Sequence, residues 1–308
     1  MSGSITSHLL GAYSHISKAF FGRHLGRHQI LSLKKDRVQF SYEVSLEICK
    51  MQTMTCSAAF AIFDELSTVG LLCLDKSHRP GVSITLSTSL SNDQSVREVK
   101  QGESVTVDIF YDKIGKTVAF TSMTMRNEHD ELVASGKHIK FLPISWFYDN
   151  IISIPFIYSI IARAIYNIEH HSLSWLGEHL LGPNNDTEVT SNIYKQIRDQ
   201  FASVTSEVDG KEVPTMTIKR KYANPFSMLH GGAAAMIVEE AVSSEKTKVE
   251  TIVMNYMNGV PVNTNVSVVV DADSVVGSDA IAGSLMTNGK AMSSFSCQLR
   301  KLEETIVY

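Results

Sequence analysis

The sequence predicts an α+β protein built from two copies of one unit, in which a long buried helix is wrapped by an antiparallel sheet. Residues 53–66 read TMTCSAAFAIFDEL and residues 228–241 read MLHGGAAAMIVEEA, and the two segments align without a gap. Each carries an apolar run without a polar face, which is typical of a helix that is buried on all sides. Alternating runs rich in β-branched residues follow and indicate strands.

A second pair of segments favours the same duplication. GKTVAFTSMTMR begins at Gly115 and GKAMSSFSCQLR begins at Gly289, a spacing of 174 residues. The helical segments are 175 residues apart, counted from Thr55 to His230. Nearly equal spacings indicate an internal repeat. We therefore expect a pseudo-dimer within one chain, whose two sheets join edge to edge and so hide strand edges that would otherwise be exposed.

The same order of elements is expected in both copies. The first copy is predicted to hold a helical stretch at His8–Leu25, a strand at Val38–Val44, the central helix at Ser57–Leu74 and strands at Gly81–Ser89, Ser104–Tyr111, Thr117–Arg126 and Leu132–Phe141. The second copy is predicted to hold a helical stretch at Ser191–Ser203, a strand at Thr215–Lys221 and the central helix at Gly232–Lys246. Prolines and the Gly182-Pro183 turn mark a linker between them. The expected domains are residues 1–142 and 191–308, joined by a helical linker at 143–190.

The composition excludes several classes of function. The chain of 308 residues is 44% hydrophobic and 19% charged, as expected of a folded globular protein. A net charge of -4 without a long basic tract argues against nucleic acid as a partner. We expect free thiols, no metal site and no cofactor, because the cysteines form no CxxC pair and have no histidine cluster beside them. The four cysteines are Cys49, Cys56, Cys73 and Cys297.

Two segments bear on cellular location. Residues 1–35 contain five Lys or Arg and no Asp or Glu, which resembles a mitochondrial transit peptide, with a first helix packed on the domain as the alternative. The apolar stretch Ile151–Ile168 is interrupted by Pro155 and Arg163 and falls short of the ~20 apolar residues of a membrane span. We expect a helix over 146–169 that packs on the protein, with membrane-surface contact left open, in a cytoplasmic or mitochondrial protein.

The segment that starts at Asn224 carries the most specific motif. It reads Asn224-Pro-Phe-Ser-Met-Leu-His-Gly-Gly, and an acid, Glu239, follows His230 by nine residues. This pattern resembles the hotdog-fold acyl-CoA thioesterases of the phenylacetyl-CoA type. The first copy is similar to small single-domain members of this thioesterase superfamily through Leu71-Leu-Cys-Leu, Gly81-Val-Ser83, the run from Gly115 and Ala134-Ser-Gly-Lys-His. The resemblance implies a tandem double hotdog that hydrolyses an acyl-CoA thioester to a free acid and CoA.

The two copies depart from the family pattern in opposite ways. The second keeps Asn224, His230 and Gly231, where the first has Cys49, Thr55 and Cys56, whereas the first keeps Asp64 and Ser83. In the family, one subunit supplies the Asn and the helix-terminal amide of a site, and its partner supplies the acid and the Ser. The resemblance therefore implies one complete site and one degenerate site. The complete site would hold Asp64, Ser83, Asn224, His230 and Gly231, and the degenerate site Glu239, Cys49, Thr55 and Cys56.

Thioester hydrolysis explains these residue types. The carbonyl oxygen becomes an oxyanion in the transition state, and an amide at the N-terminus of a buried helix, at Gly231, can stabilise it. A buried Asp64 can activate water or attack the carbonyl directly, and both routes stay open. Asn224 and Ser83 can hydrogen-bond the carbonyl, the water or the carboxylate. In the residues alone, Asn224 before a proline is also typical of a turn, and His230 of a helix cap.

The remaining expectations concern the segment that binds coenzyme A, two alternative functions and the oligomeric state. The phosphates favour cations near the mouth of the site, and a segment that lines CoA in the family matches Lys113, Gly115, Lys116, Thr117 and Val118. A non-catalytic acyl-CoA-binding scaffold stays open and would gain support if Asp64 and Gly231 did not face one another. A hotdog enoyl-CoA hydratase needs Asp-x-Asn-Pro-x-His, of which the sequence lacks the Asp and the His. A homo-oligomer of double-hotdog units also stays open.

Overall fold

The structure is a computed structural model, and it describes residues 13, 17, 20–93, 95–143, 192–208, 211–244, 246–271 and 279–301. The expected linker helix over 146–169 lies outside these residues. So does most of the expected first helix, of which Tyr13, Ser17 and the short 3-10 helix η1 (Phe21–His24) are described.

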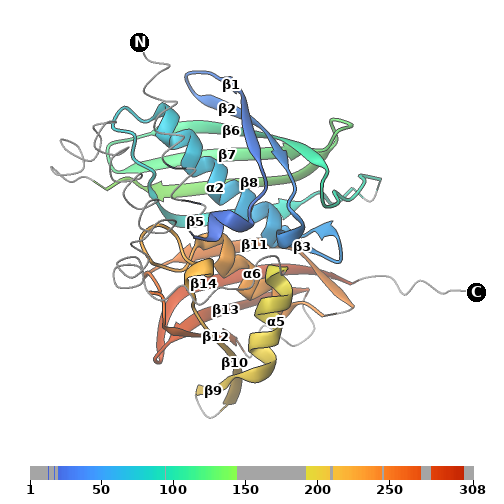
Figure 1. The fold of residues 1–308 in the computed structure, drawn as a ribbon, viewed down its shortest axis with the longest axis vertical. Coiled ribbons are helices and arrows are strands. Elements are labelled where there is room, and N and C mark those ends of the chain that lie inside the picture. Colours follow the sequence, from blue (N-terminus) through green and yellow to red (C-terminus); the bar gives the residue numbers. More distant parts are fainter. Residues whose placement is uncertain are drawn as a thin grey trace, which may run out of the picture.

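One twelve-stranded sheet runs through both copies of the described chain (Figure 1). Its strand order is β1-β2-β6-β7-β8-β5-β11-β14-β13-β12-β10-β9, so the second copy repeats the order of the first from the seam outward. The first copy contributes β1 (His28–Leu33), β2 (Arg37–Glu43), β5 (Val82–Leu90), β6 (Ser104–Ile114), β7 (Val118–Arg126) and β8 (Leu132–Phe141). The second copy contributes β9 (Thr205–Val208), β10 (Lys211–Thr217), β11 (Thr247–Tyr256), β12 (Asn265–Val270), β13 (Ala280–Thr287) and β14 (Lys290–Lys301).

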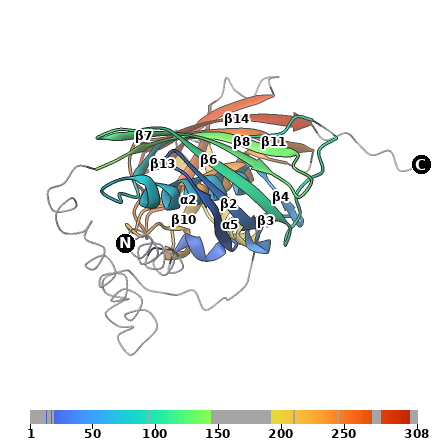
Figure 2. The ribbon, with the colours of Figure 1, turned by 90° about the horizontal axis from the view of Figure 1, so that it is seen from above.

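The helices lie under this sheet, which arches over them (Figure 2). Helix α2 (Cys56–Leu74) is central to the first copy and α6 (Gly231–Val242) to the second, while α5 (Ile193–Ser203) packs against α6. Smaller elements are η2 (Leu46–Ile48), η4 (Arg220–Tyr222) and the pair β3 (Cys49–Lys50) and β4 (Thr53–Met54). Helix α2 is long and apolar enough to cross a membrane, but 83% of it is buried inside the protein. It is the core helix of its copy.

The two copies join through strands and through helices. Strands β5 and β11 pair antiparallel at the seam, with Ser87 opposite Val253. Helices α2 and α6 touch closely, because a Cβ added at Gly232 would lie 2.6 Å from the Cβ of Ala61. The expected pseudo-dimer of two hotdog units with an edge-to-edge sheet is confirmed. The close helix contact brings the first turn of α6 against the middle of α2, where the acid lies.

Some expected elements differ from the structure. Helix α6 ends at Val242 rather than Lys246, because Ser244 and Thr247 close a turn that leads into β11. The strand expected at Thr215–Lys221 is β10, which ends at Thr217, and η4 follows it. The sequence repeat that begins at Gly115 and at Gly289 aligned two strands that are not equivalent in the fold. Gly115 precedes β7, the third strand from the seam, whereas Gly289 precedes β14, which lies next to β11.

Candidate active site

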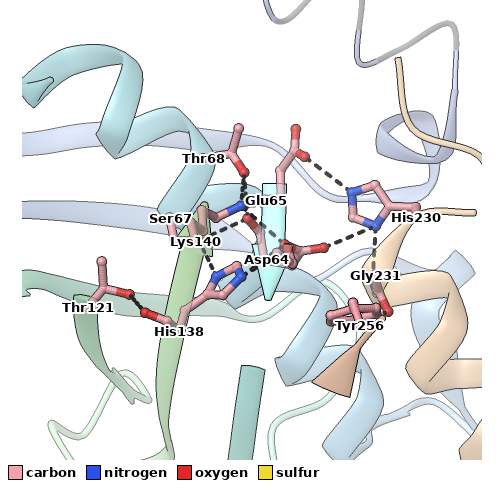
Figure 3. A network of polar contacts seen from close by, with 12 residues as sticks. Asp64, Glu65, Ser67, Thr68, Thr121, His138, Lys140, His230, Gly231 and Tyr256 are labelled. Carbon is pink, nitrogen blue, oxygen red and sulfur yellow. Dashed lines mark hydrogen bonds and ion pairs between the residues drawn. The ribbon is translucent and has the colours of Figure 1, made fainter. Parts of the chain in front are cut away.

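The carboxylate of Asp64 lies between the two central helices. Asp64 is in the third turn of α2 and is 5% exposed. The Ser83 hydroxyl, at the start of β5, donates to its Oδ1 at 3.0 Å. Gly231, the first residue of α6, is so near that an added Cβ would lie 2.6 Å from Asp64 Oδ2. Acid and helix terminus therefore come from different copies and face one another (Figure 3).

His230 and Tyr256 shape the helix terminus at this site. His230 Nδ1 accepts from the Gly232 amide at 3.0 Å and lies 3.5 Å from Asp64 Oδ2. The Tyr256 hydroxyl donates to the Gly231 carbonyl at 3.1 Å. Among the hydrogen bonds of the described residues, none uses the amide of Gly231. This N–H, at the positive end of the helix dipole, is therefore free to bind an anionic oxygen beside Asp64.

Two buried residues of β8 complete the surroundings of Asp64 and were not expected from the sequence. Lys140 Nζ lies 3.4 Å from Asp64 Oδ1 and donates to Thr68 Oγ1 at 2.7 Å. His138 places Nε2 3.0 Å from Ser83 Oγ and Nδ1 2.8 Å from Ser67 Oγ.

The hydrogen bonds at His138 have one consistent direction. The single hydroxyl hydrogen of Ser83 is donated to Asp64, so Ser83 accepts from Nε2–H of His138. The neutral ring then has no hydrogen on Nδ1, so the single hydroxyl hydrogen of Ser67 is shared between Nδ1, at 2.8 Å, and the Asp64 carbonyl, at 3.0 Å. Burial, and then the charge of Lys140, hold the pKa of His138 well below its usual value, which agrees with a neutral ring.

The charges at the site keep Asp64 ionised. Burial alone would raise the pKa of its carboxyl. The Lys140 ammonium and the Ser83 hydrogen bond act against burial, and this pKa lies below its ordinary range. The result is a buried, ionised carboxylate that faces a helix-terminal amide, so it can accept a proton next to a developing oxyanion.

The second cluster, around Glu239, is arranged differently. One oxygen of Glu239 accepts from the Ser57 amide at 3.0 Å, from the Ser57 hydroxyl, and from the Tyr194 hydroxyl at 3.3 Å. Thr55 caps α2 by accepting from the Ala58 amide at 3.2 Å. The acid of this cluster therefore serves as a helix cap, with its acceptor oxygen already bound by three donors.

The polar residues of β5 and β8 around Asp64 have apolar or thiol counterparts in β11 and β14 of the second copy. Both β5 and β11 shift register at one point, between Ser83 and Thr85 and between Val249 and Thr251. Aligning these shifts makes Val249 the counterpart of Ser83. Their partners across the ladder follow, so Leu299 corresponds to Lys140 and Cys297 to His138.

Among the described residues, no hydrogen bond joins Asn224, Cys49 or Cys56 to the two carboxylates. The Asn224 side-chain oxygen accepts from the amides of Phe226 and Met228, at 2.9 and 3.3 Å, as in a turn. No hydrogen bond described for Asn224 reaches Asp64. Cys49 is buried, and burial raises the pKa of its thiol to about 12. The Cys56 thiol, whose pKa burial also raises, donates to the carbonyls of Thr88 and Glu250.

The segment expected to contact CoA forms the turn between β6 and β7. The Gly115 amide donates to the Val118 carbonyl at 2.8 Å, and the Thr117 carbonyl accepts from Leu142 at 2.7 Å. Lys113, Lys116 and Thr117 are exposed. The turn lies at the sheet end where β5 begins and β8 ends, the end that carries Ser83 and Lys140.

A groove of about 790 Å³ lies elsewhere and is lined by residues of both copies. Its lining includes Leu90, Lys248, Glu250, Leu299 and Arg300. Lys248 is paired with Glu98, and Arg300 lies 3.1 Å from Glu250. The groove therefore presents paired charges, and it does not reach Asp64. Within the described ranges, no group of three or more His, Cys, Asp or Glu could hold a metal ion.

The chain was compared with family models and with known proteins. No family model matches it. It is 31% identical to acyl-coenzyme A thioesterase 13 of Homo sapiens, and equally to that of Pongo abelii, over 124 residues, which are 40% of this chain and 84% of each relative. The matched part is thus most of each relative and less than half of this chain.

Solved structures match almost the full chain. The 12:0-ACP thioesterase from Umbellularia californica aligns with a TM-score of 0.53 and 12% identity over 88% of this chain and 100% of that one. An acyl-ACP thioesterase from Bacteroides thetaiotaomicron aligns with a TM-score of 0.51 and 9% identity over 86% and 98%. At such identities these likenesses show the double-hotdog fold alone. Together with the closer relatives, they place the chain among the hotdog-fold acyl-CoA thioesterases, a family of thioester hydrolases to which it belongs in tandem form.

Proposed function

We propose that the protein hydrolyses an acyl-CoA thioester to a free acid and CoA at a single site, between Asp64 and the N-terminus of α6. The observation that carries this proposal is the approach of Gly231 to Asp64 Oδ2, where an added Cβ would lie 2.6 Å away. A site needs both the acid and the oxyanion donor. Among the described residues, Asp64 faces the Gly231 amide without a hydrogen bond to it, whereas Glu239 accepts from the Ser57 amide at 3.0 Å. The same approach argues against a non-catalytic scaffold.

The proposed reaction uses water as the nucleophile. The Gly231 amide binds the thioester carbonyl oxygen, and Asp64 Oδ2 removes a proton from a water that attacks the carbonyl carbon. The tetrahedral oxyanion collapses, the C–S bond breaks, and the CoA thiolate takes the proton held by Asp64. The products are the free acid and CoA, and no metal or cofactor takes part. Ser83 and Lys140 hold Oδ1, which leaves Oδ2 toward the substrate.

The CoA moiety is proposed to lie along the β6–β7 turn. Lys113 and Lys116 are exposed at the sheet end near Ser83 and Lys140, and ammonium groups there suit the CoA phosphates. Gly115 allows the tight turn that presents them. Four free cysteines and a CoA ester substrate both suit an intracellular compartment, cytoplasm or mitochondrion.

The two acids should not be equivalent. Asp64→Asn is expected to lower kcat by ~10²–10⁴, the usual loss of a general base. Glu239→Gln, its matched control at the aligned position of the other copy, should stay within about tenfold of the wild type. Hydrolysis of short-, medium- and long-chain acyl-CoAs would be followed by thiol release with 5,5′-dithiobis reagent, and folding by circular dichroism. Turnover that survives Asp64→Asn but not Glu239→Gln would reverse the assignment, and equal losses would mean two working sites.

A further inference from the structure

A second buried carboxylate lies beside the site and takes no part in the reaction proposed above. Glu65 follows Asp64 in α2 and is 4% exposed. Its side chain accepts from the Tyr13 hydroxyl at 3.0 Å and from the Ser17 hydroxyl at 2.7 Å. Its Oε2 lies 3.7 Å from His230 Nε2. His230 therefore stands between two carboxylates, Asp64 on one side and Glu65 on the other (Figure 3).

The contacts of His230 decide where its proton lies. Nδ1 accepts the Gly232 amide hydrogen, so the ring cannot carry a hydrogen on that nitrogen. A neutral ring then carries it on Nε2, which faces Glu65. The ring also stacks on Phe21, with centroids 4.7 Å apart. Glu65 thus favours the tautomer in which His230 caps α6.

The opposite tautomer would damage the site in two ways. A hydrogen on Nδ1 would point at the Gly232 amide, two donors would oppose one another, and the cap of α6 would be lost. The same hydrogen would also donate to Asp64 Oδ2, the oxygen that must accept a proton from water. An ionised Glu65 prevents this, since hydrogen bonds and the His230 ring hold the pKa of its carboxyl low in spite of burial.

The anchors of Glu65 come from the N-terminal segment. Tyr13, Ser17 and Phe21 are all buried, and the Phe21 amide donates to the Ala223 carbonyl of the second copy at 2.9 Å. The segment therefore reaches from the Glu65 carboxylate to the chain that leads into the helix terminus of the site. Cleavage of a transit peptide beyond Ser17 would remove the Tyr13 and Ser17 hydroxyls. The buried Glu65 carboxylate would lose these two hydrogen bonds, which would cost free energy of folding.

We propose that Glu65 is a positioning residue of the Asp64 site, which holds His230 in the Nε2–H tautomer, and that Tyr13 and Ser17 of the N-terminal segment hold Glu65. This inference rests on the proposed function of that site. It assigns Tyr13 and Ser17 a role in the active enzyme.

The central test is Glu65→Gln, which keeps the shape and removes the charge. It should lower kcat/KM by about 10- to 100-fold, the usual range for residues that orient a reacting group. In ¹⁵N spectra the His230 ring, assigned by its absence in His230→Asn, should change from the Nε2–H form to a mixture of tautomers. Glu240→Gln is the matched control, because Glu240 holds the aligned position and pairs with Lys50 and Arg198 instead. It should change neither readout.

A second variant keeps the test decisive if Glu65→Gln does not fold. Tyr13→Phe combined with Ser17→Ala removes both hydroxyls and leaves the charge, and it should move the ¹⁵N signal in the same direction with a loss of about tenfold in kcat/KM. Wild-type kcat/KM with an unchanged Nε2–H signal in a folded variant would overturn the inference. Asp64→Asn is measured in parallel. If that variant stays active, the proposed function fails, and if it alone is inactive, only the role of Glu65 fails.

Discussion

Lys140 provides the sharpest test of the electrostatics around Asp64. Its ammonium is 3.4 Å from Asp64 Oδ1, and both side chains are buried. At an effective dielectric constant of about 20, two unit charges at this distance attract by about 5 kcal/mol. Burying the ammonium offsets part of this attraction, and removal of one partner of a buried pair usually costs ~3–5 kcal/mol. We expect Lys140→Met to lose about that much free energy of unfolding at pH 7.

The loss should depend on pH in a stated direction. In the wild type the folded pKa of Asp64 lies below its unfolded value of about 3.9, so its stabilising effect is present above pH ~4 and falls away only at lower pH. Without the ammonium, burial dominates and the folded pKa of Asp64 is raised. The variant then takes up a proton at mildly acidic pH and is relieved of its buried charge. The difference in free energy of unfolding between the wild type and Lys140→Met should therefore be smaller at pH 5 than at pH 7.

Urea unfolding at both pH values measures this difference. Leu299→Met is the matched control, because Leu299 occupies the equivalent position of β14, and the swap should cost less than ~1.5 kcal/mol at either pH. The acid limb of the kcat/KM profile should also move to higher pH in Lys140→Met. An equal loss of unfolding free energy at pH 7 and pH 5 would refute the charge argument and would mean that Lys140 stabilises the fold by packing alone.

Three further outcomes follow from the same geometry. Gly231→Ala should lower kcat at least about 100-fold, because the added Cβ would lie 2.6 Å from Asp64 Oδ2 and 2.9 Å from the Tyr256 hydroxyl; steady-state hydrolysis measures it. Lys113→Ala with Lys116→Ala should raise KM for acyl-CoA several-fold with little change in kcat, and less so at high salt, where ionic contacts are screened. Thiol titration of the unfolded, unreduced protein should find four thiols, and stable disulfides would contradict the free cysteines of the structure.

Much of the fold could be predicted because its core residues form continuous apolar segments of the sequence. The central helix of the first copy was expected from Ser57 and begins at Cys56, and strand β8 matches its expected bounds. A helix apolar on all sides has few alternatives to burial under a sheet. The pairing of Asp64 with Gly231 across the copies was reached only through the family resemblance, since no local pattern states which helix end meets which acid.

Other features of the site could not be predicted in the same way. Lys140 and His138 lie on the same, inward face of β8 as Ala134, because the three are an even number of residues apart. This spacing was the available sequence signal that both side chains are buried. Lysine is almost never buried without a partner, and its partner, Asp64, is 76 residues away. Glu65 and Tyr256 likewise acquire their contacts only in the folded chain. The pairing of Gly115 with Gly289 failed because similar strand sequences recur in any sheet of this composition.

Tandem fusion explains why the two clusters differ so much. In a dimer of identical subunits, every residue appears in both sites, so the loss of a serine or a lysine would harm both. In one chain, the proposed site takes its acid from the first copy and its helix terminus from the second, and the remaining residues need not serve a second site. Val249, Cys297 and Leu299 stand where Ser83, His138 and Lys140 surround Asp64. Apolar side chains there avoid the cost of burying unpaired polar groups, and Glu239 is left to cap α2. The interface is thus asymmetric, because Asp64 has polar neighbours from β5 and β8 whereas the equivalent positions of β11 and β14 hold apolar or thiol side chains.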